Sequence, residues 1–223
     1  MSRAEEVAAN LLAIERRIAA ACDRAARRRD EVILVAVTKT FPATDISHAI
    51  AAGALHVGEN KVKEARDKKP TITGDARWHL LGHLQSNKAR EAVHLFDVIQ
   101  SVDSPVLAEK IARSAAALGK RQEVLLQVNI GRESQKSGAA IEDVPQFARA
   151  IAAIPALHLT GLMAIPPTGP AEAMRPYFRE LKRLRDDLGL AELSMGMTDD
   201  FEVAIEEGAT IIRVGRAIFG VRG

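Results

Sequence analysis

The sequence predicts an α/β protein: a single parallel (β/α)8 TIM-like barrel with an extra N-terminal helix. Eight short apolar segments alternate with seven segments of helical character, and each connection is long enough for a right-handed crossover. A further helical segment precedes the first strand, and none is expected after the last, so the leading helix would fill the gap in the outer ring. A doubly wound open sheet has the same alternation and is the alternative fold.

The N-terminal segment is the first expected helix. Val7, Leu11, Ile14 and Ile18 recur at steps of three and four within residues 2–28. This spacing places them on one face, which indicates an amphipathic helix packed against a core.

The strands are expected where apolar, often β-branched runs are bounded by polar residues or glycine. In chain order they are residues 32–37, 55–57, 78–82, 97–102, 124–130, 158–165, 192–195 and 210–214. Several helices begin at a capping residue or a proline and end near a glycine. We expect them over residues 44–53, 60–68, 86 onward, 104–119, 141–153, 170–188 and 199–207.

Composition limits the class of protein. With 223 residues, 47% of them hydrophobic, we expect one domain over residues 1–223 with a sizeable core. The formal charge of +2 gives no reason to expect a nucleic-acid or membrane partner, although the basic run Arg27–Arg29 leaves a nucleic-acid adaptor as an alternative to a solvated last helical turn. The single cysteine, Cys22, and the lack of an apolar leader or spanning segment predict a cytoplasmic location.

Lys39 stands at the carboxyl end of the first strand. An ammonium there must be desolvated or paired, and desolvation favours the neutral amine, which is a nucleophile toward carbonyls. The alternative is that Lys39 only marks where the strand reaches the surface. In a barrel, the carboxyl ends of all strands form one functional face, so the polar residues at the other strand ends would lie around this lysine.

The ends of the last two strands indicate an anion site. Ser194 and Thr198 precede a helix whose first amides are unsatisfied, and Gly215 permits close approach of the backbone to a ligand. Barrels commonly bind phosphate after strands seven and eight. The alternative is that Asp199 and Asp200 merely cap the helix.

Eight motifs spread over nearly the whole chain resemble the pyridoxal phosphate homeostasis protein family, also called the YggS/PROSC family. They are residues 37–40 (VTKT), 58–60 (GEN), 78–88 (WHLLGHLQSNK), 127–130 (QVNI), 136–138 (KSG), 161–166 (GLMAIP), 193–200 (LSMGMTDD) and 213–220 (RVGRAIFG). That family is similar to the N-terminal barrel of alanine racemase, which belongs to the fold-type III group of pyridoxal phosphate enzymes. The resemblance implies that the cofactor is pyridoxal 5′-phosphate (PLP).

The resemblance also assigns the cofactor's reactive end and its phosphate. Lys39 matches the lysine that holds PLP covalently as a reversible aldimine. Ser194 and Thr198, with the backbone amides of Gly215 and Arg216, match the groups that bind the phosphate.

Three further residues are assigned to the ring. The resemblance implies that Arg213 faces the pyridine nitrogen, that Asn60 lies near the ring and that Met195 forms an apolar wall. Two positions depart from the family pattern. His83 stands where bacterial relatives often have proline, and Arg216 stands where they usually have a small or different residue; its guanidinium could add affinity for a phosphate.

The resemblance and the residues together favour a carrier over an enzyme. A permanent cation facing the pyridine nitrogen leaves that nitrogen unprotonated and weakens the ring as an electron sink. Alanine racemase uses a tyrosine as its second base, whereas the only tyrosine here, Tyr177, falls in the expected helix 170–188. We therefore expect a non-catalytic, monomeric PLP carrier in vitamin B6 homeostasis that supplies apo-enzymes. A small amino-acid racemase that uses Lys39 alone is the alternative.

Two other pairs of residues are candidate binding residues. The four-residue spacing of His79 and His83 suits a zinc site on a helix, but His79 falls in an expected strand and no third ligand is evident, so we expect no metal. Lys136 and Ser137 either contact a bound anion at the rim or belong to a solvated loop.

Overall fold

All eight predicted strands are present, and they form a closed parallel barrel. The computed structural model describes residues 1–220, and residues 221–223 of the expected domain lie outside the described residues. Each strand pairs with the next along the chain, and the last pairs with the first, which excludes the open sheet. The strands are β1 (Ile33–Val37), β2 (His56–Glu59), β3 (Arg77–Leu80), β4 (Val98–Val102), β5 (Gln122–Val128), β6 (Leu157–Ala164), β7 (Glu192–Ser194) and β8 (Ile211–Val214).

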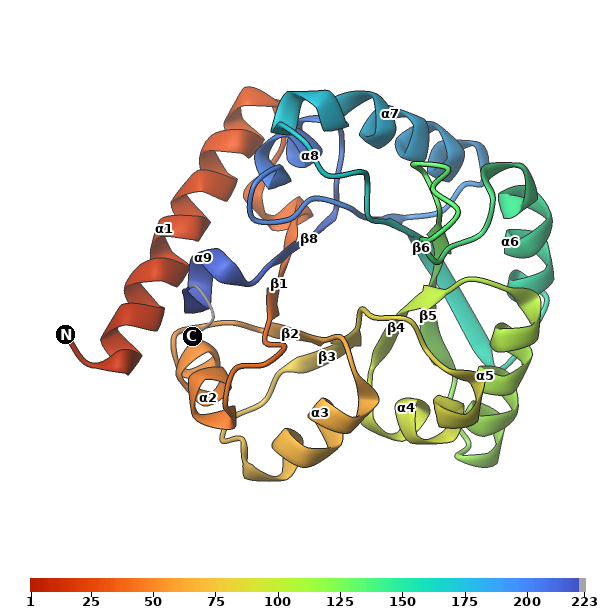
Figure 1. Cartoon of the computed structure of the whole chain (residues 1–223), viewed down its shortest axis with the longest axis horizontal. Coiled ribbons are helices and arrows are strands. Elements are labelled where there is room, and N and C mark those ends of the chain that lie inside the picture. The colour runs from red at the N-terminus through yellow and green to blue at the C-terminus, as the bar shows by residue number, and fades with distance from the viewer. Residues whose placement is uncertain (221–223) are drawn as a thin grey trace.

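The helices surround the barrel (Figure 1). Those that connect successive strands are α2 (Ala43–Ala51), α3 (Val62–Lys68), α4 (Ala89–Leu95), α5 (Pro105–Ala117), α6 (Val144–Ala152), α7 (Ala171–Asp187) and α8 (Phe201–Glu206). Helix α1 (Arg3–Arg24) precedes the first strand, and α9 (Arg216–Phe219) follows the last. Short 3-10 turns lie at Arg29–Glu31, Lys69–Thr71, Ser86–Lys88 and Ile141–Asp143.

Helix α1 occupies the position of the missing eighth connecting helix, as predicted. It packs against α2, α8 and α9 and lies across the place where the first and last strands meet (Figure 1). Its apolar face, which includes Ile18, is buried in the main core. Polar contacts fix its amino-terminal half, since Asn10 Nδ2 donates to Ile218 O at 3.0 Å and Arg3 Nη2 donates to Phe219 O at 2.8 Å.

The end of α1 differs from the prediction because Ala26 adopts a left-handed backbone with φ of 52°, and the helix ends at Arg24 instead of residue 28. Arg27 then folds back and donates to the carbonyls of Ile205 and Ala209 at 2.9 and 2.8 Å, at the carboxyl end of α8. The next two arginines each donate to a carboxylate of this chain. Arg27 and Arg29 are therefore used within the fold, which weakens the nucleic-acid adaptor hypothesis, whereas Arg28 stays 77% exposed beside Asp30.

Two other local predictions are corrected. Helix α2 begins at Ala43, one residue before the expected start, with Pro42 as its N-cap, and Asp45 lies inside the helix, where its carboxylate pairs with Arg3 at 2.6 Å. Helix α9 was not expected because four residues are too few to show a period; it is held by packing, with the Phe219 ring centroid 5.0 Å from that of Phe41. Most other boundaries agree with the predicted ones to within two residues.

None of the helices within residues 1–220 is long and apolar enough to cross a membrane.

The account of α1 makes a stability prediction. Ile18 is completely buried, so Ile18→Ala should lower the free energy of unfolding by about 2–5 kcal/mol through the lost burial and the cavity left behind. Leu12 on the same helix is 53% exposed, and Leu12→Ala should change stability by no more than about 0.5 kcal/mol. Urea denaturation of both variants measures this, and equal losses would show that α1 does not pack as described.

Candidate functional site

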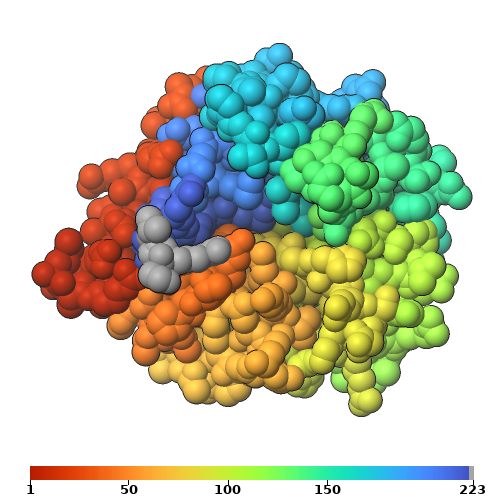
Figure 2. Space-filling view, viewed as in Figure 1, coloured from red at the N-terminus to blue at the C-terminus, as the bar shows by residue number. Residues whose placement is uncertain are grey.

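The site lies where the last strand closes onto the first. In the β1–β8 pair, Val35 is the partner of Arg213, so Lys39 after β1 comes close to the residues that follow β8. Gly215 is required at this contact, because a Cβ there would lie 2.9 Å from the carbonyl oxygen of Val37. Figure 2 looks onto this face, where the orange residues after β1 lie against the blue residues of the carboxyl-terminal segment.

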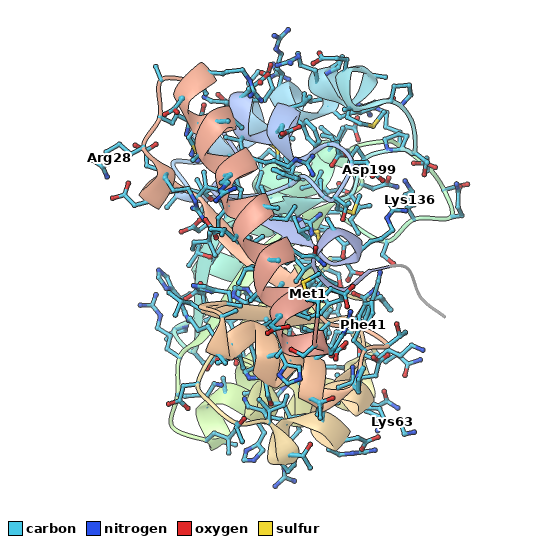
Figure 3. The ribbon with its side chains drawn as sticks, turned by 90° about the vertical axis from the view of Figure 1, so that its left-hand side faces the viewer. Met1, Arg28, Phe41, Lys63, Lys136 and Asp199 are labelled. Atoms are coloured by element: carbon cyan, nitrogen blue, oxygen red, sulfur yellow. The ribbon has the colours of Figure 1, made fainter. Side chains whose placement is uncertain are left out.

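A cavity of about 660 Å³ opens at this face, within the usual size range of small-molecule sites. Figure 3 shows Phe41, Lys136 and Asp199, three residues of its lining, on the same side of the molecule, whereas Arg28 lies at the opposite end of the barrel. Six of the eight residues proposed from the sequence line this cavity: Lys39, Asn60, Thr198, Arg213, Gly215 and Arg216.

The other two proposed residues, Ser194 and Met195, do not line the cavity. Ser194 is completely buried inside the barrel, where its hydroxyl accepts a hydrogen bond from Arg213 Nη1 at 2.6 Å and donates to Gln100 Oε1 at 2.6 Å. Met195 is also completely buried and packs in the main core; Met197, two residues later, lines the cavity. Ser194 thus contacts the guanidinium of Arg213 from the barrel interior and does not face the cavity.

Several lining residues were not proposed from the sequence, among them Phe41, Gln127, Ile165 and Met197. Gln127 Nε2 donates to Ser137 O at 3.2 Å, and its Oε1 is buried with no hydrogen-bond partner among residues 1–220. Side chains alternate between the two faces of β5, with Leu125 in the inner cluster and Leu126 in the main core, and Gln127 lies near the carboxyl end of the strand. A polar residue near the carboxyl end of a strand is the sequence signal that could have identified Gln127 as a cavity residue.

Several charged residues at the cavity rim form ion pairs or hydrogen bonds with other groups of this chain. The guanidinium of Arg216 donates to the carboxylate of Asp199. Asp200 is the N-cap residue of α8, as the alternative expects, but its side chain makes no capping hydrogen bond, and its Oδ1 accepts from Met197 N at 2.6 Å. Lys136 reaches the cavity wall while its Nζ donates to the carbonyl of Pro166 at 3.0 Å.

A chain of buried polar groups crosses the barrel interior beneath the cavity. It runs from Arg213 through Ser194 and Gln100 to His79, whose Nδ1 lies 2.9 Å from Gln100 Nε2. His79 Nε2 in turn lies 2.9 Å from Nδ1 of His56. The chain of hydrogen bonds therefore connects the cavity floor with the amino-terminal end of β2.

The direction of each donor in this chain follows from Arg213. A guanidinium can only donate, so the hydroxyl of Ser194 accepts from it and passes its own proton toward Gln100 Oε1. The amide of Gln100 then donates to Nδ1 of His79, which places the proton of His79 on Nε2, facing His56. All five groups are consistent with one arrangement in which both histidines are neutral.

Burial sets the protonation of these groups. Desolvation, with smaller contributions from His56 and Arg77, lowers the pKa of His79 to about 3, and burial also lowers the pKa of His56. Desolvation lowers the pKa of Arg213 to about 10, opposed by the charge of Asp200, so the guanidinium stays cationic at neutral pH. Its two hydrogen-bond acceptors here, Ser194 and the carbonyl of Ala164, are uncharged.

The two histidines considered for zinc are separated by this arrangement. His79 points into the barrel, whereas His83 lies at the cavity rim with Nδ1 3.3 Å from the carboxylate of Asp103. In the part of the chain that the structure describes, there is no group of three or more side chains that could hold a metal ion.

Comparison with known protein families gives a match over most of the chain. The family described as "Alanine racemase, N-terminal domain" matches residues 9–223. The pyridoxal phosphate homeostasis protein of Pseudomonas aeruginosa is 42% identical over 220 residues, which cover 97% of this chain and 96% of that protein. The protein of the same name from Escherichia coli K12 is 38% identical over 230 residues, with 97% of both chains covered.

Solved structures with the same fold give a similar result. PipY of Synechococcus elongatus with PLP bound is 38% identical, with a TM-score of 0.85, covering 96% of this chain and all of that one. Alanine racemase of Bartonella henselae with covalently bound pyridoxal phosphate has a TM-score of 0.78 over 98% of this chain and 59% of its own. At 14% identity the latter similarity concerns the fold alone.

The neutral state of His79 predicts acid sensitivity. Because its pKa is about 3 in the folded protein and 6.5 is the ordinary value, only the unfolded chain binds this proton between those pH values, and stability is lost as pH falls through that window. From pH 7 to pH 5 this group should remove about 2 kcal/mol. Urea unfolding of the native chain and of His79→Gln, which keeps hydrogen-bonding groups but does not titrate, should show a shallower pH dependence in the variant. Equal slopes would contradict the assignment.

Proposed function

The chain belongs to the pyridoxal phosphate homeostasis protein family, within the larger alanine racemase N-terminal domain family, and from this we propose that it binds PLP reversibly and serves in intracellular PLP homeostasis. The observation that carries the proposal is the presence of a primary amine, Lys39, in one cavity with the groups that a phosphorylated pyridine aldehyde requires. A relative of 38% identity that spans the same fold holds PLP.

The donor set of the cavity fits PLP. Lys39 is half-buried and supplies an amine that suits the aldehyde, and the hydroxyl of Thr198 with the backbone at Gly215 and Arg216 suits the phosphate. Asn60 is available beside the ring, and the cationic Arg213 suits a pyridine nitrogen that accepts a hydrogen bond. The apolar side chains that line the same cavity, Phe41 and Met197 among them, suit the faces of an aromatic ring.

The finer part of the proposal concerns the covalent bond and the phosphate. We propose that the neutral amine of Lys39 condenses reversibly with the aldehyde and releases one water molecule. Bound PLP supplies an electrophilic carbonyl and a conjugated ring that can accept electrons. Arg213 limits that capacity, because its guanidinium has a pKa of about 10 and at neutral pH donates a hydrogen bond to the ring nitrogen without transferring its proton.

A carrier is favoured over a racemase by the position of the candidate bases. Two-sided proton transfer needs a second base opposite Lys39, and the only tyrosine, Tyr177, lies in α7 on the outside of the barrel, packed against the main core. We therefore propose a non-catalytic, monomeric, cytoplasmic protein that delivers PLP to apo-enzymes. A single-domain racemase is the second candidate, supported only by the fold that this chain shares with alanine racemase.

The role of Lys39 can be tested by absorption spectroscopy. The native protein incubated with PLP should develop a visible band that persists on gel filtration, and Lys39→Ala should lose that band while it keeps its circular dichroism spectrum and melting temperature. Lys63→Ala is the matched control, since Lys63 is an exposed lysine of α3 that does not line the cavity. If Lys39→Ala retains the band, another lysine carries the cofactor.

The racemase alternative needs a separate measurement. Chiral chromatography of the common amino acids after incubation with the PLP-loaded protein should detect no conversion between L and D forms. Conversion that is lost in Lys39→Ala would replace the carrier proposal with the racemase.

The proposed phosphate contact predicts a difference between two ligands. Thr198→Ala should weaken binding of PLP by about tenfold, because a hydrogen bond to a charged group is lost. It should leave binding of pyridoxal, which lacks the phosphate, almost unchanged. Equal effects on both ligands in a fluorescence titration would place the phosphate elsewhere in the cavity.

A further inference from the structure

Lys39 lies in a tight turn that joins β1 to α2. The carbonyl oxygen of Thr38 accepts from Phe41 N at 3.1 Å, which closes a four-residue turn with Lys39 at its second position and Thr40 at its third. We name residues 38–41 the lysine turn. The direction in which the Lys39 side chain leaves the backbone is set by the conformation of this turn.

Thr40 holds an unfavourable backbone conformation. Its φ is 70°, in the left-handed region, which turns of this kind normally reserve for glycine or asparagine at the third position. The second branch on Cβ makes this conformation a true outlier for threonine. Such a residue persists only when its surroundings enforce it, and strain of this kind gathers at functional sites.

Two side chains from α3 hold the backbone on either side of Lys39. Glu64 Oε2 accepts from the backbone N–H of Thr40 at 2.8 Å, and Lys68 Nζ donates to the carbonyl of Thr38 at 3.1 Å. The two side chains also pair with each other at 3.1 Å, four residues apart on the helix. The turn is thus connected at both ends to one rigid element. Figure 3 shows Phe41, of the turn, and Lys63, of α3, toward the same side of the molecule.

A buried carboxylate supports this pair. Glu59 is completely buried at the end of β2, and its Oε1 accepts from Lys68 Nζ at 2.8 Å and from the hydroxyl of Thr38 at 2.8 Å. Its other oxygen is buried with no partner among the described residues, and burial raises the pKa of Glu59. The ion pair with Glu59 holds the Lys68 ammonium beside the turn, and the hydrogen bond from Thr38 ties the same carboxylate to the turn itself.

We propose that Glu64, fixed by Lys68 and Glu59, is a positioning residue for Lys39: it holds Thr40 in the left-handed conformation and so directs the lysine amine into the cavity. The inference rests on the proposed function of Lys39 for its consequence in PLP binding. The claim that Glu64 fixes the backbone of the lysine turn holds whether or not Lys39 binds PLP. Removal of the Glu64 carboxylate should let Thr40 relax to negative φ and turn the lysine away.

The test compares four variants of the full chain. Glu64→Ala removes the acceptor, Glu64→Gln keeps an amide oxygen in its place, and Asp67→Ala removes an exposed, ion-paired carboxylate of the same helix that does not contact the turn. The fourth is the double variant Glu64→Ala/Thr40→Asn. Thr40 is exposed, and asparagine tolerates left-handed φ far better than threonine, so the double variant removes the strain together with the hydrogen bond.

Two readouts are required. Hydrogen exchange of the Thr40 amide should be at least about tenfold faster in Glu64→Ala than in the native chain, and PLP affinity should fall by about tenfold, since a hydrogen bond to a charged acceptor is lost. Glu64→Gln should retain part of both, the double variant should regain most of the PLP affinity, and Asp67→Ala should match the native chain.

Three outcomes separate the inference from the proposed function. Native PLP affinity in Glu64→Ala overturns the inference, and so does a double variant no better than the single one. If the native chain takes up no PLP at all, the proposed function fails, and the exchange of the Thr40 amide alone decides whether Glu64 holds the turn. In that case, exchange of the Thr40 amide in Glu64→Ala that is as slow as in the native chain overturns the inference.

Discussion

The pairing of β8 with β1 is the contact on which the site depends. Because all eight strands are parallel, their carboxyl ends share one rim, but only closure of the sheet places the first strand beside the last. Lys39, near the start of the chain, then lies close to Arg213 and Gly215, near its end. Helix α1 covers the same junction from outside and binds α9 through backbone carbonyls, so a single element stabilises both the ring and the segment that borders the cavity.

Polar side chains are buried inside this barrel, beneath the cavity. TIM-like barrels fill their interior with branched apolar side chains, and residues such as Val35, Leu125 and Ile211 do so here. Beside them, the chain of hydrogen bonds from Arg213 to His56 satisfies each group in turn, which is the condition under which a buried polar network is tolerated. The desolvated guanidinium at one end is the group that this network holds in place, and it forms part of the cavity wall.

The sequence was informative about elements and strand ends, because hydrophobic period, turn residues and polar residues after apolar runs are local signals. These signals placed the eight strands and the role of α1, and the family resemblance added six residues that line the cavity. The sequence could not place Ser194, whose hydroxyl is used by Gln100, 94 positions away along the chain, and by Arg213. It also missed α9 and the inward turn of Arg27, since both are decided by packing between distant segments. Gln127 was missed because the inward or outward direction of a strand residue depends on the register.

Borohydride reduction of the PLP-treated protein, followed by peptide mass spectrometry, tests the central claim most directly, because it names the residue that carries the cofactor. We predict a phosphopyridoxyl group on the peptide that contains Lys39, in about one copy per chain. Modification of Lys61, Lys88 or Lys136 in place of Lys39, or none above that of an unfolded control, would contradict the account.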